Sequence, residues 1–279
     1  MRNVESLQTS NAVHPAEWLC SYLRSWARHG MYFGVAGGWS TAARQSSCVP
    51  TACVEINPRS VPPPGFSLPE HFVLTGVVVV DSLVYRYPHG HEDASKRGRI
   101  NPRFLDPGTG IDEIRRIGIL DHRFELVVLP LCQIYRSEGV TADALLPMLD
   151  HFLAALQDGR QYALEIQNDE YLVPSYFQCL QHHGIAHVLR GGPSPLLDRV
   201  LQPYVLTARR VVVRMKACGD HTLLMGLRET VRRCTEEKKN LFVYVEDGEE
   251  MSALSFLMMV MNVLNKDLAK LSPIRRNAA

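Results

Sequence analysis

Residues 162–189 read YALEIQNDEYLVPSYFQCLQHHGIAHVL, and this stretch determines the expected fold. Its first part, residues 162–168, is an apolar run that reads as a buried strand. Pro174 suits the first turn of a following helix, and Gly184 suits the end of that helix. Residues 185–189 form a second short apolar run. The succession of strand, helix and strand predicts two parallel strands joined by a right-handed crossover.

The same alternation continues on both sides of this stretch. Eight apolar or β-branched runs are candidate strands, namely 32–36, 52–57, 71–81, 124–131, 162–168, 185–189, 209–215 and 241–247. Helical patterns precede, separate or follow them at 15–29, 109–119, 141–157, 174–183, 194–202, 220–238 and 249–266. Several strands are continuous apolar runs, which is typical of strands buried on both faces. Eight strands in 279 residues favour an α/β fold of the (β/α)8 TIM-type barrel class, with a doubly wound open sheet as the alternative.

The N-terminal third fits a barrel less regularly than the rest. Residues 38–51 are too short and too polar for a crossover helix, and residues 58–70 are rich in proline. We therefore expect three parts in the chain. They are an N-terminal extension with a helix (1–30), a single, somewhat irregular barrel domain (31–270) and a basic tail (271–279).

Composition limits the classes of partner. The chain has 30 Lys and Arg residues against 29 Asp and Glu residues, so its net charge gives no overall attraction to nucleic acid or anionic lipid. The N-terminus lacks a signal-peptide pattern, and the longest apolar run, 254–264, is too short to span a bilayer, so we expect a cytoplasmic protein without membrane contact. Seven scattered cysteines form no CxxC pair, and no second pair or nearby histidine completes a zinc site with the C-x4-C of Cys48 and Cys53. We therefore expect most thiols to be in the core or half-buried and expect no cysteine-based zinc site.

Polar residues concentrate at the predicted carboxyl ends of the strands. In a barrel this is the end where functional groups gather. The polar residues at these ends are Glu55, Asn57, Glu165, Gln167, Asn168, Arg214, Lys216, Glu246 and Asp247. A carboxylate such as Glu165 inside an apolar strand is costly unless it is paired or solvated. We therefore expect Glu165 at a wet barrel mouth, facing an arginine.

Several of these segments resemble the YecE-like family, also called domain of unknown function 72. The resemblance rests on RINPRFLDP (99–107), on the stretch 162–189 and on VVVRM (211–215), with weaker matches at GGW (37–39) and VEIN (54–57). It implies a TIM barrel with no established activity. It also implies that Glu55 and Asn57, Glu165 and Asn168, and Arg214 occupy motif positions of the family.

The chain also departs from the family pattern, as a divergent member would. Gln167 replaces an arginine, Glu246 and Asp247 replace paired asparagines, and a lysine expected near the end of the third strand is missing. The mouth thus has fewer cations and more acids than the resemblance implies.

The candidate roles follow from this chemistry. Glu165 and Glu55 are candidate general acid/base groups or carboxylate ligands of a divalent metal, with structural ion pairs to Arg214 or Lys216 as the alternative. Arg214 is a candidate anion clamp. The further candidate substrate contacts are Asn168, Asn57, His187 and Arg86, and the candidate metal ligands are Glu246 and Asp247. Arg86 opens a basic, aromatic loop, residues 85–104, which could contact phosphate.

Two functions stay open on the sequence alone. The first is a hydrolase acting on a phosphorylated or nucleotide-like substrate at the barrel mouth, with a divalent metal as an optional cofactor. The second is a non-catalytic family member that binds a small-molecule or phosphate-bearing ligand, or a partner protein. The sequence does not decide whether the protein is an enzyme.

Overall fold

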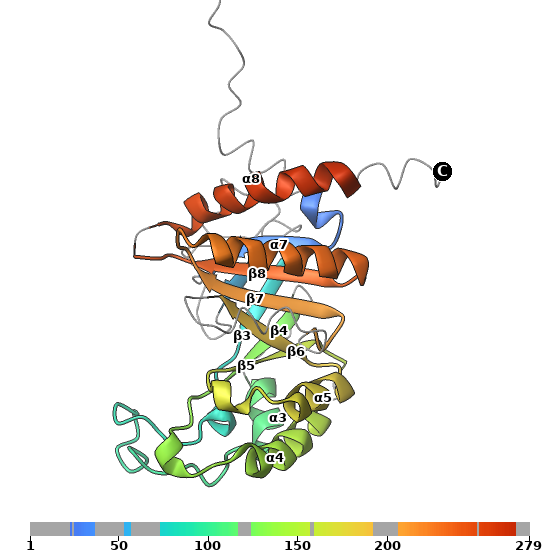
Figure 1. The fold of residues 1–279 in the computed structure, drawn as a ribbon. Coiled ribbons are helices and arrows are strands. Elements are labelled where there is room, and N and C mark those ends of the chain that lie inside the picture. The colour runs from blue at the N-terminus through green and yellow to red at the C-terminus, as the bar shows by residue number, and fades with distance from the viewer. Residues whose placement is uncertain are drawn as a thin grey trace, which may run out of the picture.

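The fold is an α/β arrangement of parallel strands with helices packed around them (Figure 1). The computed structural model describes residue 23 and residues 25–36, 53–56, 73–116, 124–156, 159–191, 206–249 and 251–271. The eight strands are β1 (Met31–Val35), β2 (Cys53–Ile56), β3 (Val73–Val77), β4 (Phe124–Leu131), β5 (Tyr162–Ile166), β6 (Ala186–Gly191), β7 (Arg210–Lys216) and β8 (Asn240–Glu246).

Described helices follow the strands β3, β4, β5, β7 and β8, as the sequence predicts for this part of the chain. The α-helices are α3 (Pro107–Arg116), α4 (Ala142–Ala155), α5 (Pro174–His182), α7 (His221–Glu236) and α8 (Ala253–Leu271). Three short 3-10 helices are η1 (Asp81–Leu83), η2 (Arg136–Glu138) and η3 (Asp169–Tyr171). Of the predicted helix 15–29, residues 23 and 25–27 are helical, and the predicted helix 194–202 lies outside the described residues.

All eight strands pair in parallel in one curled sheet of order β1-β8-β7-β6-β5-β4-β3-β2. This order never reverses, which excludes the doubly wound alternative. It is the order of a barrel opened between β1 and β2. Within the residues that the structure describes, these two strands share no hydrogen-bonded ladder. The structure therefore shows a partial barrel, and the fully closed barrel that we predicted is not seen.

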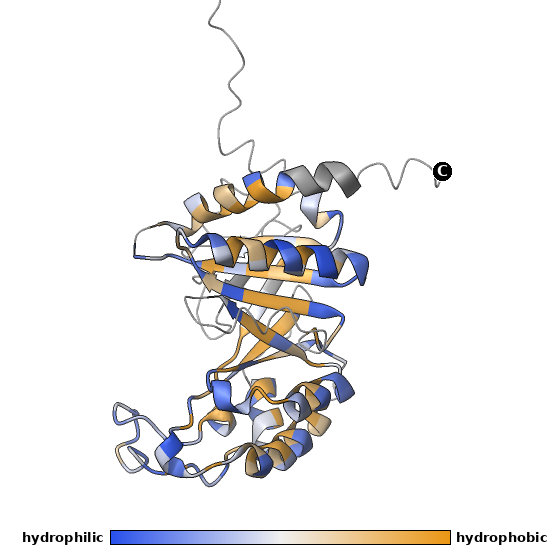
Figure 2. Ribbon diagram, viewed as in Figure 1, coloured by the Kyte–Doolittle hydropathy of each residue, from blue (hydrophilic) through white to orange (hydrophobic). Residues whose placement is uncertain are grey.

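The sheet has an apolar layer on each side, because successive side chains of a strand point to opposite faces. The inner layer includes Val128, Ala163, Val188 and Phe242. The outer layer packs the other strand residues, such as Leu164, against the helices. Figure 2 shows the apolar residues along the strands, with hydrophilic residues toward the strand ends.

The helices divide over the outer side of the sheet (Figure 1). Helices α7 and α8 lie beside β8, and α5 lies beside β6, with α4 next to it. The Thr141 hydroxyl caps α4 by accepting a hydrogen bond from the Ala144 N–H at 3.3 Å. Helix α5 begins at Pro174, and Gly184 follows it with a φ of +66°, a conformation that favours glycine. Both predicted boundaries are confirmed.

The last helix begins later than predicted. The sequence placed its start at residue 249, whereas α8 begins at Ala253. The reason is the Asp247 carboxylate, which accepts a hydrogen bond from the Ala253 N–H at 2.8 Å. Among the described residues, no helix is long and apolar enough to cross a membrane.

Candidate functional site

A cluster of charged side chains from four adjacent strands lies at the carboxyl end of the sheet. Its members are Glu165 of β5, Arg190 of β6, Arg214 of β7 and Glu246 of β8, and we call them the ion cluster. The position of each follows from strand alternation. Ala163, Val188, Val212 and Tyr244 are inner-layer residues, and each cluster residue lies two positions beyond one of them. The backbone pairing of Arg190 with Arg214 places the two arginines side by side.

Glu165 is the centre of the ion cluster. Its side chain is 4% exposed, and each of its carboxylate oxygens contacts a different guanidinium group. Oε2 accepts a hydrogen bond from Arg214 Nη1, and Oε1 lies 3.4 Å from Arg190 Nε. The carboxylate is therefore tolerated in a buried strand because it is doubly paired. The expected pairing of Glu165 with an arginine is present.

The two arginines differ in their access to solvent. The Arg214 side chain is 18% exposed, and its Nη2 also donates to Glu246 Oε1 at 3.2 Å. The Arg190 side chain is 50% exposed. Lys216 is also exposed, and it pairs in register with Glu246. Three cations thus lie near two carboxylates. Arg190, Lys216 and Glu246 are accessible to solvent, whereas Arg214 and Glu165 are the more buried groups.

A buried polar contact lies one layer beneath the ion cluster. The hydroxyl groups of Thr75 on β3 and Tyr244 on β8 form a hydrogen bond, and both residues are fully buried. The two strands are far apart in the sheet order, so this contact crosses the inside of the curl. Glu55 pairs in register with Thr75, but its side chain and all of Asn57 lie outside the described residues.

Asn168 has a structural environment in this arrangement. Its side-chain amide is buried and forms two hydrogen bonds to the backbone of Ile134. Nδ2 donates to the carbonyl at 2.7 Å, and Oδ1 accepts from the N–H at 2.8 Å. Nδ2 also donates to Glu170 at 3.1 Å. These contacts tie the end of β5 to the segment after β4.

His187 lies on the helix side of the sheet, where it does not join the ion cluster. Its Nδ1 is 3.0 Å from the Tyr176 hydroxyl, and its ring packs edge-on against Tyr176 and Phe177 of α5. Burial lowers the pKa of His187 to about 3, so the ring is neutral. The predicted substrate contact would therefore require a path through the layer between β6 and α5.

Asp247 and Arg86 also have partners within the fold. The Asp247 carboxylate binds the first N–H of α8, as described above. The Arg86 guanidinium forms a two-point pair with Glu138, at 2.5 Å for both contacts, and donates to the Gly98 carbonyl. These contacts raise the pKa of Arg86 and lower that of Glu138. Neither Glu246 nor Asp247 belongs to a group of three potential metal ligands in the described part of the chain.

The structure adds cationic residues that the sequence did not single out as site residues. Arg190 was missed because the predicted strand ended at Leu189, two residues before the end of β6. A second location is a pocket of about 400 Å³ in the connection between β3 and α3. The residues around it include Tyr87, Lys96, Arg99, Asn101 and Arg103. All five belong to the basic, aromatic loop, residues 85–104, that the sequence predicted as a possible phosphate contact.

The fold and the ion cluster define a partial-barrel α/β protein with a charged carboxyl edge, and the comparisons identify its family. The family model described as "Protein of unknown function DUF72" matches residues 114–278. Since this is more than half of the chain, the protein belongs to the DUF72 family. The matched region contains the whole ion cluster, whereas Glu55 and Asn57 precede it.

One solved structure agrees with this assignment at the level of the fold. A DUF72 family protein from Enterococcus faecalis V583 is 15% identical, with a TM-score of 0.52 over 84% of this chain and 97% of that chain. A DUF72 family protein from Thermotoga maritima is 14% identical, with a TM-score of 0.48 over 84% of this chain and 99% of that chain. The search of curated proteins finds no match.

Proposed function

We propose that the carboxyl edge of the sheet binds a small, phosphate-bearing ligand, with Arg190 and Arg214 as anion contacts. The observation that carries this proposal is the pair of arginines on neighbouring strands, both held by one buried carboxylate. A guanidinium group presents its N–H donors in a fixed plane that matches phosphate oxygens. Fixing two such groups in advance reduces the entropy lost when an anion binds.

Glu165 is a positioning residue in this proposal. Both of its carboxylate oxygens face guanidinium groups, so neither is free to act as a general base or as the sole ligand of a metal. Arg190 provides the accessible donors, because half of its side chain is exposed and its contact to Glu165, through Nε, is 3.4 Å long. Lys216 adds a further positive charge at the same edge.

Hydrolysis of a phosphorylated or nucleotide-like substrate is the finer form of the proposal. It requires a carboxylate outside the Glu165 pairing, and Glu55 is the candidate, because β2 pairs with β3 at the inner Thr75 position. The proposal also assumes that the barrel closes between β1 and β2. Some Cα atoms of these two strands lie within 8 Å of one another. Closure would bring the Glu55 strand next to β1 and complete the mouth.

Binding can be tested by measuring the melting temperature in millimolar inorganic phosphate and in millimolar AMP. A ligand that binds only the folded state at ten times its Kd stabilises it by about 1.4 kcal/mol, which raises Tm by a few degrees. We expect this rise in the wild type and its loss in Arg190→Met. The matched control is Arg232→Met on α7, because Arg232 is similarly exposed at 55% and paired to Glu229 and Glu236.

Two further variants separate the possible outcomes. A response lost in Arg99→Gln/Arg103→Gln but kept in Arg190→Met would place the ligand in the loop pocket and contradict the proposed site. Release of phosphate from nucleotide substrates, abolished by Glu55→Gln, would support the hydrolase. Binding without turnover would support the non-catalytic reading. A wild type that responds to neither probe would overturn the proposed ligand class.

A further inference from the structure

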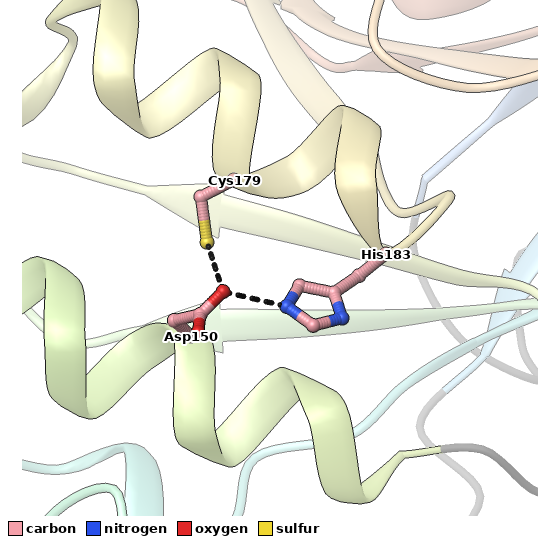
Figure 3. Close-up of side chains that lie close together, drawn as sticks. All are labelled: Asp150, Cys179 and His183. Atoms are coloured by element: carbon pink, nitrogen blue, oxygen red, sulfur yellow. Dashed lines mark hydrogen bonds and ion pairs between the residues drawn. The ribbon is translucent and has the colours of Figure 1, made fainter.

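A group of three potential metal ligands lies on the helix layer, apart from the ion cluster. Asp150 comes from α4, whereas Cys179 and His183 come from α5 and its C-cap (Figure 3). The two α5 residues are four positions apart, so both face the same side of the helix. Figure 3 shows this side turned toward Asp150 on the neighbouring helix.

The geometry brings three different donor atoms together. His183 Nε2 lies 2.8 Å from Asp150 Oδ1, and Cys179 Sγ lies 3.6 Å from the same oxygen. All three donor atoms lie within 4.8 Å of one another. Ligands about 2.0–2.3 Å from a tetrahedral zinc ion are about 3.3–3.8 Å apart, so small side-chain rotations bring these atoms to ligating distance.

The surroundings suit a site that is fixed on one side and open on the other. The His183 side chain is 7% exposed and Cys179 is half-buried, whereas the Asp150 side chain is 58% exposed. The ligands on α5 are thus held by the packing of the two helices, and the carboxylate borders solvent. An ion pair alone accounts for the contact between Asp150 and His183. It does not require a sulfur atom beside the same carboxylate oxygen.

We propose that Asp150, Cys179 and His183 bind one divalent transition-metal ion of the zinc type. Sulfur, imidazole nitrogen and carboxylate oxygen are the ligands that Zn²⁺ takes in proteins, and hard ions such as Mg²⁺ take oxygen instead. Three protein ligands leave a fourth position for water on the exposed side. On binding, Cys179 becomes a thiolate and its proton goes to solvent. The ion would join α4 to α5.

The test uses Co²⁺ as a spectroscopic substitute for Zn²⁺ on the metal-free full-length protein. A thiolate bound to Co²⁺ gives a charge-transfer absorption band that carboxylate or imidazole ligands do not give. We expect this band in the wild type, saturating at one Co²⁺ per chain and bleached by added Zn²⁺. Cys179→Ser should abolish the band. His183→Gln should weaken Co²⁺ binding by more than the roughly 10–100-fold that loss of an outer-sphere partner costs.

The control variants are chosen on the same helix and among the other thiols. His182→Gln removes the neighbouring histidine. Cys218→Ser removes a half-buried thiol that lies between β7 and α7. Both variants should keep the band. A band that survives in Cys179→Ser, or no band in the wild type, would overturn the site. If Cys179→Ser does not fold, the site is tested instead by the rate at which an alkylating reagent modifies Cys179 in the wild type. Zn²⁺ should slow modification of Cys179 and leave Cys218 unaffected, and equal rates with and without Zn²⁺ would refute the proposal.

Discussion

At the scale of single residues, Glu165 shows how a charge is accommodated inside a buried strand. Its carboxylate meets two guanidinium groups, one of which also reaches Glu246. Replacing it by glutamine would remove the charged partner of Arg214, whose side chain is 18% exposed, and would leave its longer contact to Glu246 in place. Removing one partner of a buried ion pair leaves the other charge buried without compensation, and this is the main cost to the free energy of unfolding.

We therefore expect Glu165→Gln to lower the free energy of unfolding by about 3 kcal/mol, measured by urea denaturation. Adding Arg214→Met should recover much of that loss, because it removes the less exposed of the two guanidinium groups, and water can still solvate Arg190, whose side chain is 50% exposed. The control is Glu125→Gln, since Glu125 is 46% exposed in its 2.6 Å pair with Arg210. That variant should lose less than about 1 kcal/mol. Equal effects of Glu165→Gln and Glu125→Gln would show that the ion cluster is not a buried pair.

At the scale of elements, the strands were predictable and the partners of their polar residues were not. Seven of the eight predicted strands match the structure to within two residues, because continuous apolar runs identify strands buried on both faces. The partners depend on contacts between distant segments. Asn168 binds the backbone of Ile134, and Arg86 binds Glu138, 52 residues away. Neither contact leaves a local pattern in the sequence.

The proposed metal ligands also combine a local pattern that the sequence shows with a distant contact that it does not. The four-residue spacing of Cys179 and His183 is visible in the sequence, and the predicted helix 174–183 includes both. Asp150 lies on another helix, 29 residues before Cys179. Its place beside them follows only from the packing of α4 against α5. The sequence reasoning considered cysteine spacing alone and therefore expected no metal site at a cysteine.

The packing of α5 on β6 makes a prediction about pH. His187 lies between the two elements with its pKa lowered to about 3 by burial, against an ordinary value of 6.5. Below pH 6.5 the unfolded chain binds a proton there and the folded chain does not. The stability that this histidine contributes is therefore complete above about pH 6.5 and is lost as the pH falls toward 3.

We expect about 2 kcal/mol of this loss between pH 6.5 and pH 5. It is measured as the difference in unfolding free energy between the wild type and His187→Gln at several pH values. That difference should shrink by this amount as the pH falls, because the variant lacks the titrating group. If the unfolding free energies of the wild type and of His187→Gln change equally with pH, the His187 ring is protonated in the folded state.

At the scale of the whole molecule, closure of the sheet between β1 and β2 determines whether the carboxyl edge forms a complete mouth. The observed strand order is that of a barrel, and Thr75 and Tyr244 meet across its inside. Successive N–H groups of a strand point to opposite neighbours. An edge strand of a parallel sheet therefore leaves about half of its amides without a ladder partner, whereas a strand inside a closed barrel leaves none.

Residue-resolved hydrogen exchange distinguishes the two arrangements. We expect all backbone amides of β1 and β2 to exchange slowly, at rates close to those of β7, which has a neighbour on each side. This follows from the short distance between the two strands and from their positions at the two ends of the observed order. Fast exchange at alternate residues of β2, with slow exchange throughout β7, would show that the sheet stays open. The ligand-binding mouth would then be incomplete between β1 and β2. Glu55 on β2 could not act as the carboxylate that the proposed hydrolysis requires.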